Sequence, residues 1–223
     1  MNVLNLLRWL LPCCCCLRKR PNAKAIMDIS QHFLQNTSQL LASPTDDYCW
    51  WSNWYRLMGL GRLNPQGLDF NKAKKGHWNI PVSKGLTLRK VMAVIDEYFT
   101  ISSLNITDVR SLQTEDIRSI NRRSYLISLK PNEITDCSED NLSGKVAMTL
   151  IERLLLELYY WSLTGQHLDS NSTMSRCCGS TFQGKHLDVY WLTSLGGIII
   201  DKAIDRSNFL IKRQPILRLL CSN

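Results

Sequence analysis

Residues Lys145–Leu163 read KVAMTLIERLLLELYYWSL and form the longest helical pattern in the chain. Apolar side chains occupy most faces of a helix drawn through this segment, which is typical of a helix enclosed by other elements. Ser143 is the expected N-cap and Gly165 the expected stop. The segment therefore predicts a central core helix, with Arg153 and Glu157, four residues apart, as an exposed ion pair.

Strand patterns lie on both sides of this helix. Ser124–Lys130 alternates in polarity, and a hairpin is expected around Gln183–Lys185, with its second strand at His186–Thr193. Gly197–Asp201 predicts a third strand, whereas Cys177–Gly179 predicts a turn. These segments predict a small antiparallel sheet next to the apolar helix.

Helical patterns dominate the first half of the chain. Ala25–Ala42 has helical periodicity, and Asp46–Met58 predicts a second, shorter helix. Thr87 is expected to cap a third helix that runs to about Thr100. The order of helices, followed by strands mixed with helices, favours an α+β fold with a helical N-terminal part.

The helix expected at Asp46–Met58 is rich in aromatic residues. We expect this cluster to pack on the main domain; a second membrane-interface contact and a base-stacking platform are the alternatives. Its aromatic residues are Tyr48, Trp50, Trp51, Trp54 and Tyr55.

Composition indicates a folded, basic protein. The 223 residues are 44% hydrophobic and 21% charged, which is typical of a globular chain, and the net charge is +8. An excess of this sign favours an anionic partner, either lipid headgroups or nucleic acid. We divide the chain into a membrane-anchoring segment (1–24), a helical and aromatic segment (25–59) and a globular α+β domain (60–223).

The cysteines indicate a reducing compartment. There are nine, an odd number, and four of them are consecutive, so their spacing is not that of a disulfide framework. Sequons at Asn36, Asn105, Asn141 and Asn171 are the opposing signal, and they matter only if the chain enters the secretory lumen.

The first residues, MNVLNLLRWLLPCCCC, predict an amphipathic helix that lies in a membrane interface and ends at Pro12. Its apolar stretch is interrupted by Arg8, is too short to span a bilayer and precedes the positive charges, unlike a signal peptide. The residues expected to contact the membrane are Leu7, Arg8, Trp9, Leu10, Leu11, Arg18, Lys19, Arg20 and Lys24.

The cysteine run lies between this helix and the basic cluster. Cys13, Cys14, Cys15 and Cys16 are therefore candidates for S-acylation by palmitate. One acyl chain gives marginal anchoring, but an apolar helix, several acyl sites and a basic patch together give a stable anchor. We expect a peripheral, lipid-anchored protein on the cytosolic face of a membrane.

A loop-rich stretch after the aromatic helix, residues 60–86, is also basic. Its lysines Lys72, Lys74, Lys75 and Lys84, together with Arg62, form a candidate surface for an anionic partner, either lipid or RNA phosphates. A solvated surface is the alternative. The stretch contains no glycine-rich phosphate loop.

No catalytic signature is present, and the sequence implies no cofactor and no metal. A thiolate mechanism would need Cys177 or Cys178 with a histidine and a carboxylate brought together in space. Candidate partners are His167, His186, Asp169 and Asp188, and a zinc site would combine Cys137, Cys177, Cys178 and His186 without the usual ligand spacing.

In layout alone, the chain is similar to the small basic matrix proteins of negative-strand RNA viruses. The likeness rests on the membrane-seeking N-terminus, the extended segment and helix within His77–Phe99, and the long helix before strands. It implies a non-enzymatic scaffold or adaptor that binds a protein or nucleoprotein partner and self-associates at a membrane. The alternative is a membrane-tethered enzyme, or a host-acylated effector, with dispersed active residues.

Overall fold

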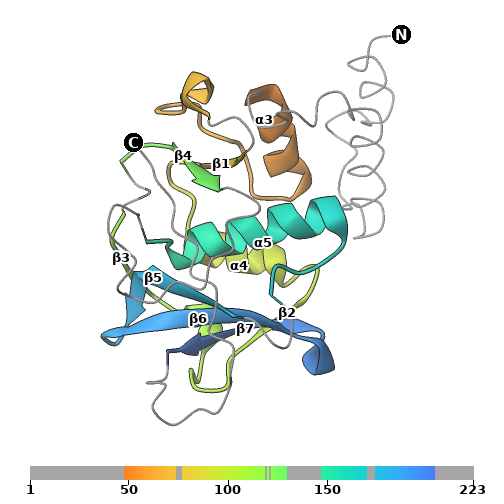
Figure 1. The fold of residues 1–223 in the computed structure, drawn as a ribbon, viewed down its shortest axis with the longest axis vertical. Coiled ribbons are helices and arrows are strands. Elements are labelled where there is room, and N and C mark those ends of the chain that lie inside the picture. The colour runs from red at the N-terminus through yellow and green to blue at the C-terminus, as the bar shows by residue number, and fades with distance from the viewer. Residues whose placement is uncertain are drawn as a thin grey trace.

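The structure of the chain, a computed structural model, describes residues 48–73, 77–118, 120, 122–129, 147–169 and 174–203. Within these ranges the chain forms three α-helices and two β-sheets, and its fold is of the α+β class (Figure 1). The helices expected within residues 1–11 and 25–42 lie outside the described residues.

The central helix α5 spans Leu150–Thr164 and confirms the expected core helix. It begins five residues later than the pattern predicted, because Thr149 is its N-cap and forms a capping box with Glu152. The carbonyl of Met148, in the segment expected to be helical, instead accepts a hydrogen bond from the backbone N–H of Gly179. Gly165 ends the helix in the left-handed conformation, as predicted.

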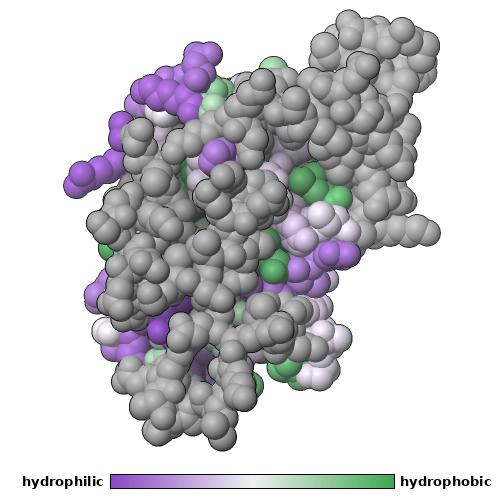
Figure 2. Space-filling view, viewed as in Figure 1, coloured by the Kyte–Doolittle hydropathy of each residue, from purple (hydrophilic) through white to green (hydrophobic). Residues whose placement is uncertain are grey.

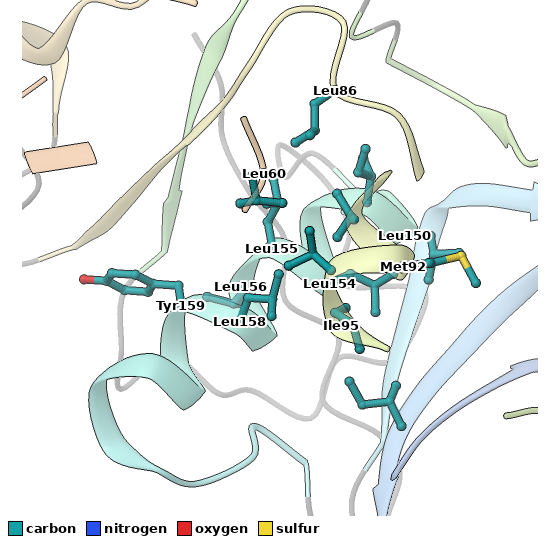
Figure 3. Packing of buried hydrophobic residues seen from close by; sticks show 14 of the residues in the cluster. Leu60, Leu86, Met92, Ile95, Leu150, Leu154, Leu155, Leu156, Leu158 and Tyr159 are labelled. Carbon is teal, nitrogen blue, oxygen red and sulfur yellow. The ribbon is translucent and has the colours of Figure 1, made fainter. Parts of the chain in front are cut away.

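Neighbouring elements enclose α5 on all sides. Every side chain from Leu150 to Tyr159 is buried. Helix α4 (Leu88–Ile95) and strands β5 (Ser175–Phe182) and β1 (Trp78–Val82) contact it, and in Figure 1 it lies between the five-stranded sheet and α3 (Tyr48–Leu57). Figure 3 shows its leucines packed with Met92 and Ile95 of α4.

The larger sheet is mixed instead of purely antiparallel. Its strand order is β2-β7-β6-β5-β3, with β2 parallel to β7 and the other pairs antiparallel. The parallel pair joins segments nearly a hundred residues apart, so no local pattern indicated it. The further strands are β2 (Thr100–Ser102), β3 (Glu115–Asp116), β6 (Lys185–Leu192) and β7 (Gly197–Lys202).

The expected hairpin is present as β5 and β6, joined at Gln183 and Gly184, which both have positive φ. Cys177–Gly179, however, lie inside β5 and not in a turn. The register shifts between Cys177 and Thr181, which places Gly179 against residues 147–148. A Cβ there would lie 2.7 Å from the Ala147 carbonyl oxygen, so the close approach requires glycine.

The smaller sheet pairs β1 with β4 (Tyr125–Leu129), which confirms the strand expected there. Thr87 caps α4 as predicted, but α4 ends at Ile95 and Asp96 is its C-cap, so the helix is shorter than expected. Three short 3₁₀ helices complete the described elements: η1 (Phe70–Lys72), η2 (Val109–Ser111) and η4 (Thr193–Leu195).

The aromatic face of α3 packs into the core, as expected from the sequence. Trp51, Trp54 and Tyr55 are buried. The rings of Trp51 and Tyr159 lie 5.1 Å apart, and the indole N–H of Trp54 donates to Ser162 Oγ of α5. The helix thus belongs to the same core cluster as α5.

Candidate functional site

Most of the site residues expected from the sequence lie outside the described residues. This holds for the cysteine run Cys13–Cys16, for the membrane-contacting residues up to Lys24, and for Lys74 and Lys75 of the basic stretch. Lys72 and Lys84 are described: Lys72 is the last residue of η1, and Lys84 lies in the loop that follows β1 of the smaller sheet.

Three loops meet beside the smaller sheet, and the buried residue Ser124 joins them. Its hydroxyl donates to the Asn64 carbonyl at 2.7 Å and accepts from the Lys84 N–H at 2.8 Å. Its own N–H donates to the Gln66 carbonyl, and the Asn64 N–H donates to Ser83 Oγ. Segments 62–67, 83–86 and 122–124 are therefore held in one arrangement.

Basic side chains project from all three loops. The Lys84 ammonium donates to Gln66 Oε1, and a Cβ on Gly67 would lie 3.0 Å from Arg123 Cβ, so both cations flank the Gln66–Gly67 turn. None of the three loops contains an acidic residue. We call Arg62, Lys84, Arg122 and Arg123 the basic loop face.

Lys72 lies outside this face and forms an ion pair with Asp69 at 3.6 Å. The sequence reasoning identified Lys84 and Arg62 but missed Arg122 and Arg123, which lie far along the chain from the other loops. The signal in the sequence that could have identified them was that Arg122 and Arg123 are adjacent basic residues.

Figure 2 shows hydrophilic side chains gathered along the upper left of the molecule, over the loop that carries η1 and beside the start of β4.

The candidate thiol Cys177 has the properties of a core residue. It is 1% exposed in β5, and burial raises the pKa of its thiol well above the ordinary value. His186 lies with Nδ1 3.4 Å from the Ser180 carbonyl oxygen. Asp188 accepts two hydrogen bonds from Arg176. Each of these residues thus has a structural partner or a buried position.

A buried ionic network surrounds Arg153 of α5. Its guanidinium donates to Glu157 Oε2 at 2.8 Å and to Asp169 Oδ2 at 2.5 Å. His167 Nδ1 lies 2.8 Å from the other Glu157 oxygen, and Ser175 Oγ donates to Asp169. The Arg153–Glu157 pair exists as predicted, but it is buried and not exposed, because β5 and the loop after α5 cover that face of the helix.

The electrostatics of this network favour the charged forms of Arg153 and Glu157. Burial alone would raise the pKa of Glu157, but the charge of Arg153 and the hydrogen bond with His167 outweigh it and hold the pKa below its ordinary value. The His167 ring stacks on Trp191 with centroids 3.4 Å apart. These contacts fix the loop after α5 against β6.

A second network ties α5 to the smaller sheet and to the edge of the larger one. Arg118 forms a two-point ion pair with Glu152, and the Tyr125 hydroxyl donates to the same carboxylate. Burial and the neighbouring Glu152 charge raise the pKa of Tyr125. The Glu152 carboxylate therefore takes part in the helix cap, in the ion pair with Arg118 and in the hydrogen bond with Tyr125 of β4.

Asn105, the one described sequon asparagine, has a structural role. Its side-chain amide donates to the Lys202 carbonyl, and its oxygen accepts from the Lys202 N–H at 2.7 Å. Glycosylation would break this pairing. The same turn presents Leu104, which is 71% exposed, while Asp201 accepts its N–H.

Among the described residues, no group of three or more His, Cys, Asp or Glu side chains is placed to hold a metal ion. Within the same part of the chain, no helix is long and apolar enough to cross a membrane. No protein-family model, curated protein or solved structure matches the chain.

Proposed function

We propose that the protein is a peripheral membrane scaffold, anchored to the cytosolic face of a membrane by its N-terminal segment. The observation that carries the proposal is the succession of an apolar segment, Cys13–Cys16 and the cluster Arg18–Arg20 at the start of the chain. Acyl chains on these cysteines add membrane affinity to that of an N-terminal amphipathic helix and the basic cluster. The helical character of residues 1–11 and 25–42 is part of this proposal.

The buried charged groups of the folded part support a scaffold role. Its buried charged groups are ion-paired or hydrogen-bonded inside the domain, as in the Arg153 and Glu152 networks, and several of these contacts join α5 to other elements. Cys177 and Asp188, considered for thiolate chemistry, have the structural positions described above. The domain would present its surface to a protein or nucleoprotein partner, or to a second copy, in the manner of a viral matrix protein.

The test is acyl-exchange labelling combined with cell fractionation. The wild type is compared with a variant in which Cys13, Cys14, Cys15 and Cys16 are all replaced by serine. Cys49→Ser is the matched control, because Cys49 is an exposed cysteine of α3. We expect the wild type and the control to be acylated and membrane-bound, and the fourfold variant to be unacylated and soluble. An unacylated, soluble wild type would overturn the proposal.

A further inference from the structure

We propose that the folded domain makes a second, direct contact with anionic lipid headgroups through the basic loop face, Arg62, Lys84, Arg122 and Arg123. This inference rests on the proposed membrane anchor and adds to it the orientation of the domain on the bilayer. The partner is a membrane surface that exposes acidic phospholipids.

The face is fixed before any partner binds. Ser124 is fully buried and bonds to residues of the other two loops, and the Gly85 N–H donates to the Ile120 carbonyl. The carbon stem of Arg123 lies over Gly67, whose φ is +94°. Binding therefore requires no ordering of the loop backbones, which lowers the entropic cost of association.

The charge on this face is uncompensated among the described residues. Arg62, Arg122 and Arg123 are exposed and make no ion pair there, and Lys84 bonds to the neutral amide of Gln66. By contrast, Arg110 pairs with Asp96 and Arg176 with Asp188 on the larger sheet and its loops. Each basic residue close to an anionic leaflet contributes roughly 1 kcal/mol of binding.

Lipid is favoured over RNA because every aromatic side chain of the described residues is buried or partly buried, and none is fully exposed. Single-stranded RNA is bound by basic grooves combined with exposed aromatic rings on which bases stack. The exposed large apolar side chains of the described residues are Leu104, Ile117 and Leu195, and none is aromatic. Of the five aromatic residues considered for base stacking, Trp51, Trp54 and Tyr55 are buried in the core. The other two, Tyr48 and Trp50, are partly buried and pack against the same core.

The anchor and the face would act together. A domain tethered to a bilayer experiences a high effective concentration of headgroups, so a weak electrostatic contact is enough to orient it. The contact should weaken as salt is raised, since the Debye length falls to about 10 Å at 0.1 M salt.

The experiment separates the face from acylation, and the apolar segment and Arg18–Arg20 are the same in every variant. The full chain carrying Cys13–Cys16→Ser, which cannot be acylated there, is mixed with phosphatidylcholine vesicles with and without phosphatidylserine, and bound protein is measured by co-sedimentation. Arg122→Gln/Arg123→Gln is compared in this background with Lys185→Gln/Lys202→Gln. Both doubles remove two positive charges, but the second pair lies on β6 and β7 of the larger sheet. Thermal unfolding confirms that all the variants are folded.

We expect the arginine double to bind phosphatidylserine vesicles roughly ten- to thirtyfold more weakly, given about 1 kcal/mol for each charge. The lysine double should change binding less than threefold (about 0.65 kcal/mol), and neither should affect phosphatidylcholine alone. Equal losses in the two doubles would overturn the inference, because net charge and not the face would then govern binding. Loss of single-stranded RNA binding by the arginine double, with vesicle binding unchanged, would overturn it in favour of RNA. Neither result depends on acylation, which the labelling and fractionation experiment tests separately.

Discussion

Arg153 carries a positive charge in the middle of a helix whose every face is covered, and the side chain is 1% exposed. A charge in that position is tolerated only when it is paired and hydrogen-bonded. Glu157 and Asp169 supply two carboxylates, and His167 and Ser175 hold those carboxylates in place. At the scale of single residues, this network is where the structure departs most from the expected exposed pair.

Replacing Arg153 with methionine should destabilise the protein by about 3–5 kcal/mol, because two buried carboxylates lose their counter-charge. The free energy of unfolding is measured by urea titration. Arg110→Met is the control: Arg110 is 68% exposed in its pair with Asp96, so its loss should lower the free energy of unfolding far less than the loss of Arg153. Similar costs for the two variants would show that the Arg153 network is not buried in solution.

Cys177 should be unreactive in the native protein, because burial excludes reagents and keeps its thiol protonated. Native labelling with a maleimide, followed by peptide mass spectrometry, should modify the exposed Cys49 and leave Cys177 unmodified. Both should be labelled once the protein is unfolded in urea. Rapid native labelling of Cys177 would contradict its core position and would support the alternative in which this residue acts as a reactive thiolate.

Elements are delimited by their caps more sharply than by their apolar patterns. The run from Lys145 continues without interruption into α5, yet the helix begins at Leu150. The Thr149 hydroxyl accepts the Glu152 N–H, the Glu152 carboxylate accepts the Thr149 N–H, and Ser180 Oγ of β5 accepts the Leu150 N–H. The residues before the cap are then free to pair with β5 at Gly179. The cap thus positions both the core helix and one side of the larger sheet.

Thr149→Ala should therefore cost about 1 kcal/mol, within the range of about 0.5–2 kcal/mol for lost N-caps. Thr107→Ala, at an exposed turn position, is the matched control and should stay within about 0.5 kcal/mol of the wild type. Thermal or urea unfolding measures both variants. No loss in Thr149→Ala would indicate that the helix begins elsewhere.

At the scale of the whole molecule, one core connects the three described α-helices with both sheets. The cluster of buried side chains runs from Trp51 of α3 through α4 and α5 to Ile200 of β7. The Glu152 network also links α5 to β4 of the smaller sheet. Both sheets are therefore parts of one packed unit.

We expect this unit to unfold in a single cooperative transition. Tryptophan fluorescence, which reports on α3, β1, α5 and β6 through their tryptophans, and far-ultraviolet circular dichroism, which reports on all elements, should give coincident urea curves. A separate early transition in fluorescence alone would show that the described elements do not unfold as one cooperative unit.

Much of the fold follows from local sequence. The apolar run of α5, the Gly165 stop, the Thr87 cap, the Gln183–Gly184 turn and the strand at Tyr125–Leu129 act over a few residues, and such signals can be read from the chain. The α+β class follows from their order. The membrane-anchor hypothesis likewise depends on adjacent residues, 1–24, and needs no tertiary structure to be stated.

Tertiary structure decided what depends on contacts between distant segments. The parallel pairing of β2 with β7, the placement of Cys177–Gly179 inside β5 and the burial of Arg153 each need a partner far along the chain. The basic loop face likewise exists only because Ser124 joins loops about 40 and 60 residues away. The physical reason is that helix and turn signals act through neighbouring residues, whereas burial and surface charge depend on which segments the folded core brings together.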